Sequence, residues 1–264
     1  MWRDDLSVKI EKRRYELLGK DFQTNRCGKC FVIDYKGANN VTVMFYEPMF
    51  IVNCTFNSLS GGHVTNPYQI TVHGVGYLGV GKYSPKERKV YTTWRTMLSR
   101  AYDTLYQKVR PSYDGVTVCK EWHNFQNFAE WYYRQKDCDS KDIRGKSYQL
   151  DKDILIKGNK VYSPQTCCFI PHEVNSLLIS CQASRGDCPV GVDLFKRTGK
   201  YVSKVRVGGV ARKQLGYFDT AQEAFLAYKA AKETYIKEVA EKWKGKIDVK
   251  VYQALLDWKI EITD

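Results

Sequence analysis

The stretch KYVSKVRVGGVARKQLGYFDTAQEAFLAYKAAK, residues 200–232, decides the fold of the C-terminal part of the chain. Side chains alternate in character over residues 200–207, which predicts a β-strand. One face of this strand should hold Tyr201, Ser203, Val205 and Val207, and the other face should hold Val202, Lys204 and Arg206. Residues 212–218 predict a second strand, and the spacing of Thr220 and Glu223 is that of a capping box. We therefore expect a sheet followed by a long helix that begins after Thr220.

The composition of the whole chain is that of a folded protein with a surplus of positive charge. The chain has 264 residues, 43% of them hydrophobic, and 42 Lys and Arg against 29 Asp and Glu. No apolar run is long enough for a membrane span, and residues 1–18 are too charged for a signal peptide. We expect a cytoplasmic protein that does not bind membranes, with an anionic partner; nucleic acid is favoured because its phosphates attract clustered cations.

Four segments can be separated along the chain. Residues 1–68 combine a short basic helix at 9–18 with two strands, CFVIDY and VTVMFY, joined by a turn at 36–40. Residues 69–180 contain two amphipathic helices, KVYTTWRTMLSRAYD and EWHNFQNFAEWYY, and residues 187–245 hold the sheet and the long helix. Residues 246–264 predict a short terminal helix. The fold class is α+β.

Nine cysteines without a secretion signal indicate reduced thiols. Cys27 and Cys30 form one CxxC pair, and no second pair has matching spacing. Buried thiols are therefore expected in place of a zinc site. The role of residues 1–68 is open between a DNA-contacting β module and a domain that only packs.

Residues 191–233 resemble the ethylene-response-factor-type (Apetala-like) DNA-binding domain of plants and mobile nucleases. The resemblance rests on Gly199-Lys200-Tyr201, on Leu215 to Thr220, and on Glu223-Ala224, Ala227-Tyr228 and Ala230-Ala231. It implies a three-stranded antiparallel sheet on one helix, with the sheet laid in the major groove of double-stranded DNA. One such module reads a short site alone, so a monomer suffices.

The resemblance also implies which side chains contact DNA. Lys204, Arg206, Arg212 and Gln214 align with positions that contact DNA in the family. Lys196, Arg197, Lys200 and Lys213 are expected to contact phosphates, which position the protein without reading sequence. Asp193 and Phe195 stand where the family often has arginine, and Gln214 replaces a common tryptophan. These departures leave the target sequence open.

YTTWRTMLSRAYD, PSYDGVTVCKEWHNFQNFAEWY and LDKDILIKGNKVYSPQTCCFIPHEVN together resemble phage-encoded relatives of HNH endonucleases, which often carry a response-factor-type domain. The N-terminal module also looks like one found in such proteins. The HNH motif implies a ββα element that holds one divalent metal, with LDKDI on the first strand. The asparagine that ties the loop together is expected to be replaced near Cys167.

In this resemblance Asp151 and Asn175, the latter at the start of the helix, are the metal ligands. Oxygen and amide ligands suit Mg²⁺ or Mn²⁺ better than zinc. Lys152 stands in the position of the general-base histidine, and strand alternation would turn Asp153 to the same face as Asp151. Asp153 is a candidate substitute base or ligand, and His172 is the nearest histidine to the motif.

Three hypotheses remain open from the sequence. In the first, the protein is a metal-dependent, homing-type DNA endonuclease with a non-standard base. In the second, the HNH-like fold is only a scaffold, and the protein is a DNA-binding or regulatory protein. In the third, LDKDI is an ordinary salt-bridged strand, and the surface contacts a protein such as a host factor.

Overall fold

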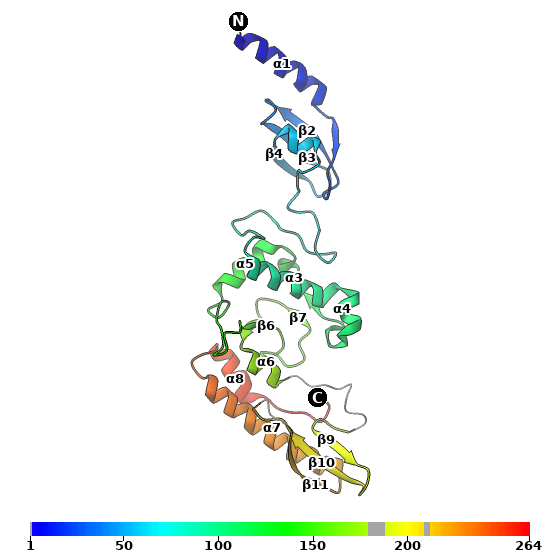
Figure 1. The fold of residues 1–264 in the computed structure, drawn as a ribbon, viewed down its shortest axis with the longest axis vertical. Helices are drawn as coiled ribbons and strands as arrows, with labels where there is room; N and C mark the ends of the chain where they lie inside the picture. Colours follow the sequence, from blue (N-terminus) through cyan, green and yellow to red (C-terminus); the bar gives the residue numbers. More distant parts are fainter. Residues whose placement is uncertain (1, 179–187, 209–211) are drawn as a thin grey trace. The chain divides into compact units, whose positions relative to one another are not determined.

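The computed structural model describes residues 2–178, 188–208 and 212–264. The chain divides into two compact units, the first ending at Glu130 and the second beginning at Trp131. The predicted α+β class is confirmed: an N-terminal four-stranded sheet, a central helical region with small sheets, and a C-terminal three-stranded sheet (Figure 1). The boundaries predicted at residues 180 and 187 lie outside the described residues, and those at 68 and 245 stay predictions.

The first unit begins with a helix and an antiparallel sheet of order β1-β2-β3-β4. Its elements are α1 (Trp2–Leu17), β1 (Asp21–Gln23), β2 (Lys29–Tyr35), β3 (Val41–Phe45), β4 (Phe50–Cys54) and α2 (Phe56–Ser60). Alternate residues of β2 and β3, such as Cys30, Val32 and Val43, are buried in one core. The turn predicted at 36–40 is present, because the Lys36 N–H donates to the Asn40 carbonyl at 2.9 Å. The basic helix is longer than the predicted 9–18.

The rest of the first unit is mainly helical. Its elements are α3 (Arg88–Tyr102), α4 (Thr104–Val109), the 3-10 turn η1 (Pro111–Tyr113), β5 (Thr117–Val118), η2 (Lys120–His123) and α5 (Phe125–Arg134), which crosses the unit boundary. The stripe predicted on α3 is buried, including Val90 and Trp94. A single helix over 121–133 is wrong. Asn124 is extended and its side chain accepts the Gln126 N–H at 2.9 Å, so α5 starts anew.

The second unit contains a small ββα element and the C-terminal module. The ββα element comprises β6 (Gln149–Asp151), β7 (Val161–Tyr162), β8 (Cys168–Ile170) and α6 (His172–Leu177), with β6 antiparallel to β8. The C-terminal module comprises β9 (Val192–Phe195), β10 (Lys200–Val205), β11 (Lys213–Phe218), α7 (Ala221–Trp243) and α8 (Val249–Asp257). The predicted capping box at Thr220 and Glu223 and the terminal helix α8 are both present.

The sheet packs on the N-terminal half of α7, whose Ala224, Phe225 and Tyr228 are buried (Figure 1). Gly191 lies against this core with φ +76°, and a Cβ there would meet the Tyr228 ring at 2.0 Å. Only glycine fits both the backbone and the space. The C-terminal half of α7 packs against α8. No helix in the described part of the chain is long and apolar enough to cross a membrane.

Candidate nucleic-acid interface and ββα element

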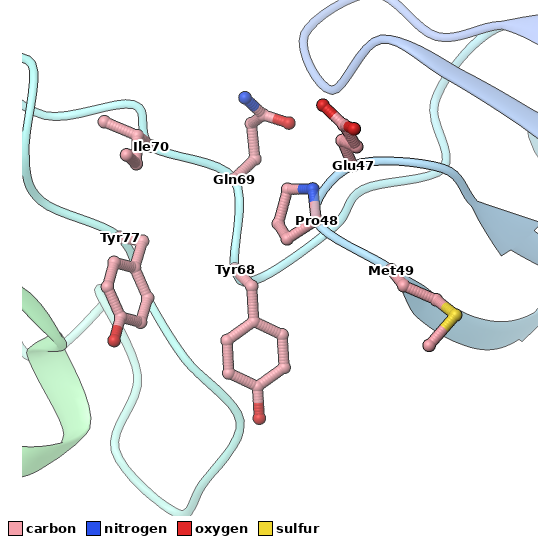
Figure 2. A pocket seen from close by; sticks show the side chains of 7 residues that line it. All are labelled: Glu47, Pro48, Met49, Tyr68, Gln69, Ile70 and Tyr77. Atoms are coloured by element: carbon pink, nitrogen blue, oxygen red, sulfur yellow. The ribbon is translucent and has the colours of Figure 1, made fainter.

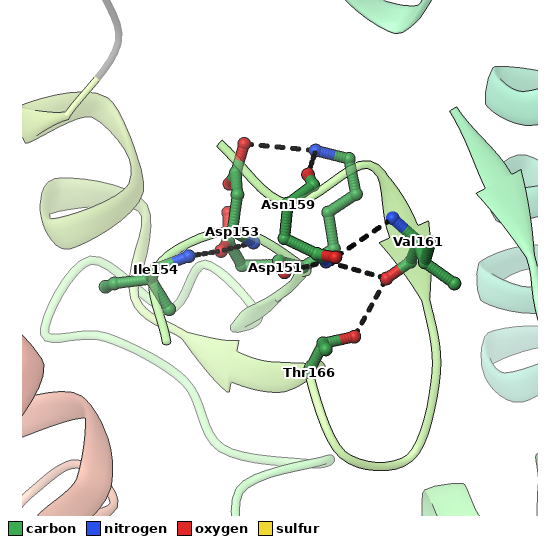
Figure 3. Close-up of polar contacts among 7 residues, drawn as sticks. Asp151, Asp153, Ile154, Asn159, Val161 and Thr166 are labelled. Atoms are coloured by element: carbon green, nitrogen blue, oxygen red, sulfur yellow. Dashed lines mark hydrogen bonds and ion pairs between the residues drawn. The ribbon is translucent and has the colours of Figure 1, made fainter. Parts of the chain in front are cut away.

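Strand β6 ends at Asp151 because the side chain of Asp151 turns the backbone. Its Oδ1 accepts the N–H groups of Asp153 at 3.0 Å and Ile154 at 2.8 Å (Figure 3). An aspartate that caps its own following backbone favours a turn over a strand. The predicted strand through Ile154 is therefore wrong, and Asp153 lies in the turn, where strand alternation does not apply.

The carboxylate of Asp151 is largely buried. The pKa of Asp151 is raised to about 6, first by burial and then by the nearby Asp153 carboxylate, and the two backbone N–H bonds offset only part of this rise. Cys168 is its register partner across β6 and β8, and burial, followed by the Asp151 charge, raises the pKa of that thiol as well. Both backbone bonds are accepted by the Oδ1 atom of Asp151.

Lys152 is buried, with 7% of its surface exposed. Its ammonium donates to the Asp153 Oδ2 and to the Asn159 carbonyl, both at 3.0 Å, and lies 5.9 Å from the centre of the Tyr162 ring. A buried cation needs such partners, and these bonds join the residues that follow β6 to the segment that precedes β7. The residue predicted in the position of the general base is thus engaged in holding the loop.

The tie across the loop comes from Asn159. Its amide donates to the carbonyls of Lys152 at 2.6 Å and Val161 at 2.7 Å, and Thr166 donates to the same Val161 carbonyl at 2.8 Å (Figure 3). Cys167, near which the motif's asparagine is expected to be replaced, is a buried thiol before β8, and that expectation stays a prediction. The Gly158-Asn159 turn was the signal in the sequence.

Helix α6 starts at His172, after Pro171, so Asn175 is its fourth residue and the prediction that it starts the helix is wrong. The Asn175 amide donates to the Gln149 side chain on β6 at 2.6 Å, which brings it close to the strand that ends at Asp151. His172 is exposed. Among the described residues, no hydrogen bond or ion pair joins His172 to Asp151, Lys152 or Asp153.

Glu173 fastens α6 to α7. Its carboxylate accepts from the Lys242 ammonium at 2.7 Å and from the Trp243 indole N–H at 2.9 Å. Tyr148 adds a second link, because its hydroxyl donates to the Lys246 carbonyl at 3.2 Å and its ring meets Trp243. The ββα element and the C-terminal module are therefore joined by specific polar contacts within the second unit. The sequence did not predict this link.

The outer face of the β9–β11 sheet points away from α7, and of the predicted DNA contacts Lys204 and Gln214 lie on it as register partners. In register, Asp193 of β9, Val202 of β10 and Tyr217 of β11 form one row across the sheet. The next row pairs Lys204 with Gln214, after a bulge between Ser203 and Lys204. The predicted inward side of β10 is confirmed for Ser203 and Val205, which are buried.

Part of this face is covered by aromatic rings. Phe195 and Tyr217 come from the strands on either side of β10, and their ring centroids lie 5.8 Å apart. They meet across β10 and shield Val202, which is 4% exposed although it lies on the outer side. The guanidinium of Arg197 lies 5.4 Å from the centre of the Phe195 ring. This part of the face is therefore apolar, with the Arg197 guanidinium at its edge.

The remaining half of the face is polar. Lys204 and Asp193 form an ion pair of 3.0 Å, and Lys200 forms one of 3.1 Å with Asp219. The other predicted contact residues are exposed and lie on the strands or the segments that join them: Lys196, Arg206, Arg212, Lys213 and Gln214. The structure therefore brings all eight predicted DNA-contacting residues to the sheet and its adjoining segments.

The first unit contains an open pocket of about 680 Å³. Figure 2 shows its lining: Glu47, Pro48, Met49, Tyr68, Gln69, Ile70 and Tyr77. The rings of Tyr68 and Tyr77 lie 6.0 Å apart. Glu47 is the one charged side chain in this lining, and a carboxylate repels phosphates, so the pocket is not suited to a DNA backbone.

Comparisons of the chain with protein-family models, with curated proteins and with solved structures find no match. Among the residues that the structure describes, no three His, Cys, Asp or Glu side chains gather in a group that could hold a metal ion.

Proposed function

We propose that the protein binds double-stranded DNA in a sequence-directed way through the outer face of its β9–β11 sheet. The observation that carries the proposal is the gathering of seven cations and Gln214 on this sheet and the segments that join its strands. A two- or three-stranded sheet fits the major groove, and clustered cations gain affinity by releasing counterions from phosphates. The net charge of +13 supports the same partner.

The contacts fall into two classes. Lys204 and Gln214 are neighbours on β10 and β11, and their amine and amide groups can reach base edges. Arg206 and Arg212 follow and precede these strands, and each can donate a fork of hydrogen bonds to a guanine or to a phosphate. Lys196, Arg197, Lys200 and Lys213 surround them and are assigned to phosphates. One sheet of this size reads a short site, so binding does not require a dimer.

The ββα element is proposed to be a scaffold for this module. Lys152 is buried and holds the loop through Asp153 and Asn159, so it does not offer a free amine to a water molecule. Glu173 joins the element to α7, the helix under the sheet. This arrangement supports the role of a rigid extension of the DNA-binding module.

A phage-type, homing-like HNH endonuclease is the second candidate, because Asp151 ends β6 and Asn175 is hydrogen-bonded to Gln149 of the same strand. Asp151 and Asn175 would hold Mg²⁺ or Mn²⁺, which would polarise a scissile phosphate. The remaining candidates for the general base are Asp153, 48% exposed at its side chain, and the exposed His172. If the protein is this endonuclease, it should cleave DNA in the presence of metal, and the Asp151→Ala variant should not.

The test is a binding assay with random-sequence duplex DNA at several salt concentrations. The double variant Lys204→Glu/Arg206→Glu should lose at least about tenfold in affinity and lower the salt slope, because two cations at the DNA surface are replaced by carboxylates that repel phosphates. Glu substitutions at Lys237 and Lys250, which are exposed on α7 and α8, change the net charge equally and serve as the control. Equal affinities for the two variants would refute the proposed interface.

A further inference from the structure

The outward side of α3, in the first unit, is made entirely of hydrogen-bond donors. The helix buries Val90, Trp94, Met97, Leu98 and Ala101 along one stripe. At 3.6 residues per turn, the residues on the opposite arc are Arg88, Lys89, Thr92, Arg95, Thr96 and Ser99. Arg88, Lys89, Thr92 and Arg95 are exposed, and Thr96 and Ser99 are half-buried. We call these six residues the α3 donor arc.

The α3 donor arc differs from an ordinary solvated helix face. Such faces usually mix both signs, and glutamate–lysine pairs one turn apart add a few tenths of a kcal/mol each. The arc has three cations, three hydroxyls and no carboxylate. A surface of this charge attracts an anionic partner.

The spacing of the arc suits a polyanion with a regular repeat. Arg88 and Arg95 are seven residues apart, which is two turns and about 10.5 Å along the helix. Phosphates on one strand of B-DNA advance by about 3.4 Å each along the duplex axis, so two arginines about 10.5 Å apart can contact different phosphates. Hydroxyl groups between them, from Thr92 and Ser99, can donate to phosphate oxygens as well.

We propose that the α3 donor arc is a second DNA-contacting surface, which binds the sugar–phosphate backbone without reading sequence. This inference rests on the proposed DNA-binding function and extends it to the first unit. A protein with two contact surfaces should protect a longer stretch of DNA than the β9–β11 sheet alone. The arc supplies affinity, and the sheet supplies sequence preference.

The test uses the full-length protein and a labelled random-sequence duplex of about 40 base pairs, several helical turns long. Arg88→Glu/Arg95→Glu should weaken binding about tenfold or more and lower the salt slope by about 2. Arg88→Lys/Arg95→Lys keeps both charges and should bind within about twofold of the wild type, because phosphates accept either cation. Arg88→Ala/Arg95→Ala replaces the Glu variant in the test if that variant fails to fold. Alanine keeps the helix, and this variant should lower the salt slope by a similar amount.

The control is Lys237→Glu/Lys250→Glu, which changes net charge equally at exposed positions of the second unit. The inference is overturned if the α3 variants lose no more affinity than this control, or if their affinity falls with an unchanged salt slope. If the wild type itself shows no salt-sensitive binding, the proposed function fails together with the inference. If only the sheet variant Lys204→Glu/Arg206→Glu weakens binding, the function stands and the α3 inference alone fails.

Discussion

The Lys204 ammonium lies 3.0 Å from the Asp193 carboxylate, across two neighbouring strands of the outer sheet face. Both side chains are partly exposed, at 35% and 46%. The Asp193 carboxylate engages the central lysine of the face and lowers the positive potential of that face.

Asp193→Asn should therefore raise affinity for random-sequence DNA a fewfold and steepen the salt slope by up to about 1, because Lys204 is released to contact DNA. Stability should change by less than about 1 kcal/mol, as is usual for an exposed ion pair. Fluorescence anisotropy titrations at several salt concentrations measure the DNA affinity and its salt slope, and thermal unfolding measures the stability. A loss of affinity would instead show that the Asp193 carboxylate contacts a base, such as a cytosine amino group.

Gly191→Ala should destabilise the second unit by about 3 kcal/mol or more, because the new methyl group would lie 2.0 Å from the Tyr228 ring at a backbone angle of φ +76°. Gly199→Ala is the matched control. It has φ +72° with no atom within 4 Å of the added Cβ, so it carries only the backbone cost of about 1–2 kcal/mol. Urea unfolding separates the two, and equal losses would contradict the close packing of Gly191 on Tyr228.

Lys152→Met should cost about 3 kcal/mol of unfolding free energy, since it leaves the Asn159 carbonyl and the Asp153 carboxylate without their buried donor. Lys141→Met, at an exposed position of the same unit, should cost less than about 0.5 kcal/mol. Chemical denaturation of both variants is the measurement. A Lys152→Met protein as stable as the wild type would mean that this lysine is kept for chemistry.

Glu233 gives a pH-dependent contribution to the stability of the C-terminal helices. Burial alone would raise its pKa, but the Ile260 N–H and the Lys229 ammonium more than offset it, so the pKa lies below its ordinary value of 4.5. A lowered carboxyl pKa stabilises the fold above pH 4.5, and that stability is lost as the pH falls.

Glu233→Gln should therefore lower stability by up to about 1 kcal/mol at pH 7 and by less as the pH falls below 4.5. Urea unfolding of the variant and the wild type at pH 7 and pH 3.5 would show the convergence. A difference that stays constant over this range would contradict an electrostatic role for Glu233.

The sequence predicted the elements whose signals are local and periodic. The buried stripe of α3 and the capping box at Thr220 follow directly from residue spacing. The outer and inner faces of β10 were also predicted correctly at Lys204 and Ser203. The burial of Val202 was not, because it depends on two rings, Phe195 and Tyr217, that meet from different strands.

The ββα element could be predicted only in outline. Its turn after Asp151 depends on a side chain that accepts two backbone N–H groups, and a pattern of alternation cannot reveal that choice. The tie made by Asn159 and the inward direction of Lys152 are likewise tertiary features. The resemblance to HNH endonucleases placed Lys152 where a base would stand, whereas its ammonium is engaged by Asp153 and Asn159.

The most direct measurement is a combined cutting and binding assay on the DNA of the source genome. The protein and its Asp151→Ala variant are incubated with that DNA, with and without Mg²⁺ or Mn²⁺, and binding is measured at two salt concentrations. We expect tight, salt-sensitive binding by both proteins and no cuts under any condition. Metal-dependent cuts that disappear in Asp151→Ala would contradict the scaffold role, and the absence of salt-sensitive binding would contradict the account as a whole.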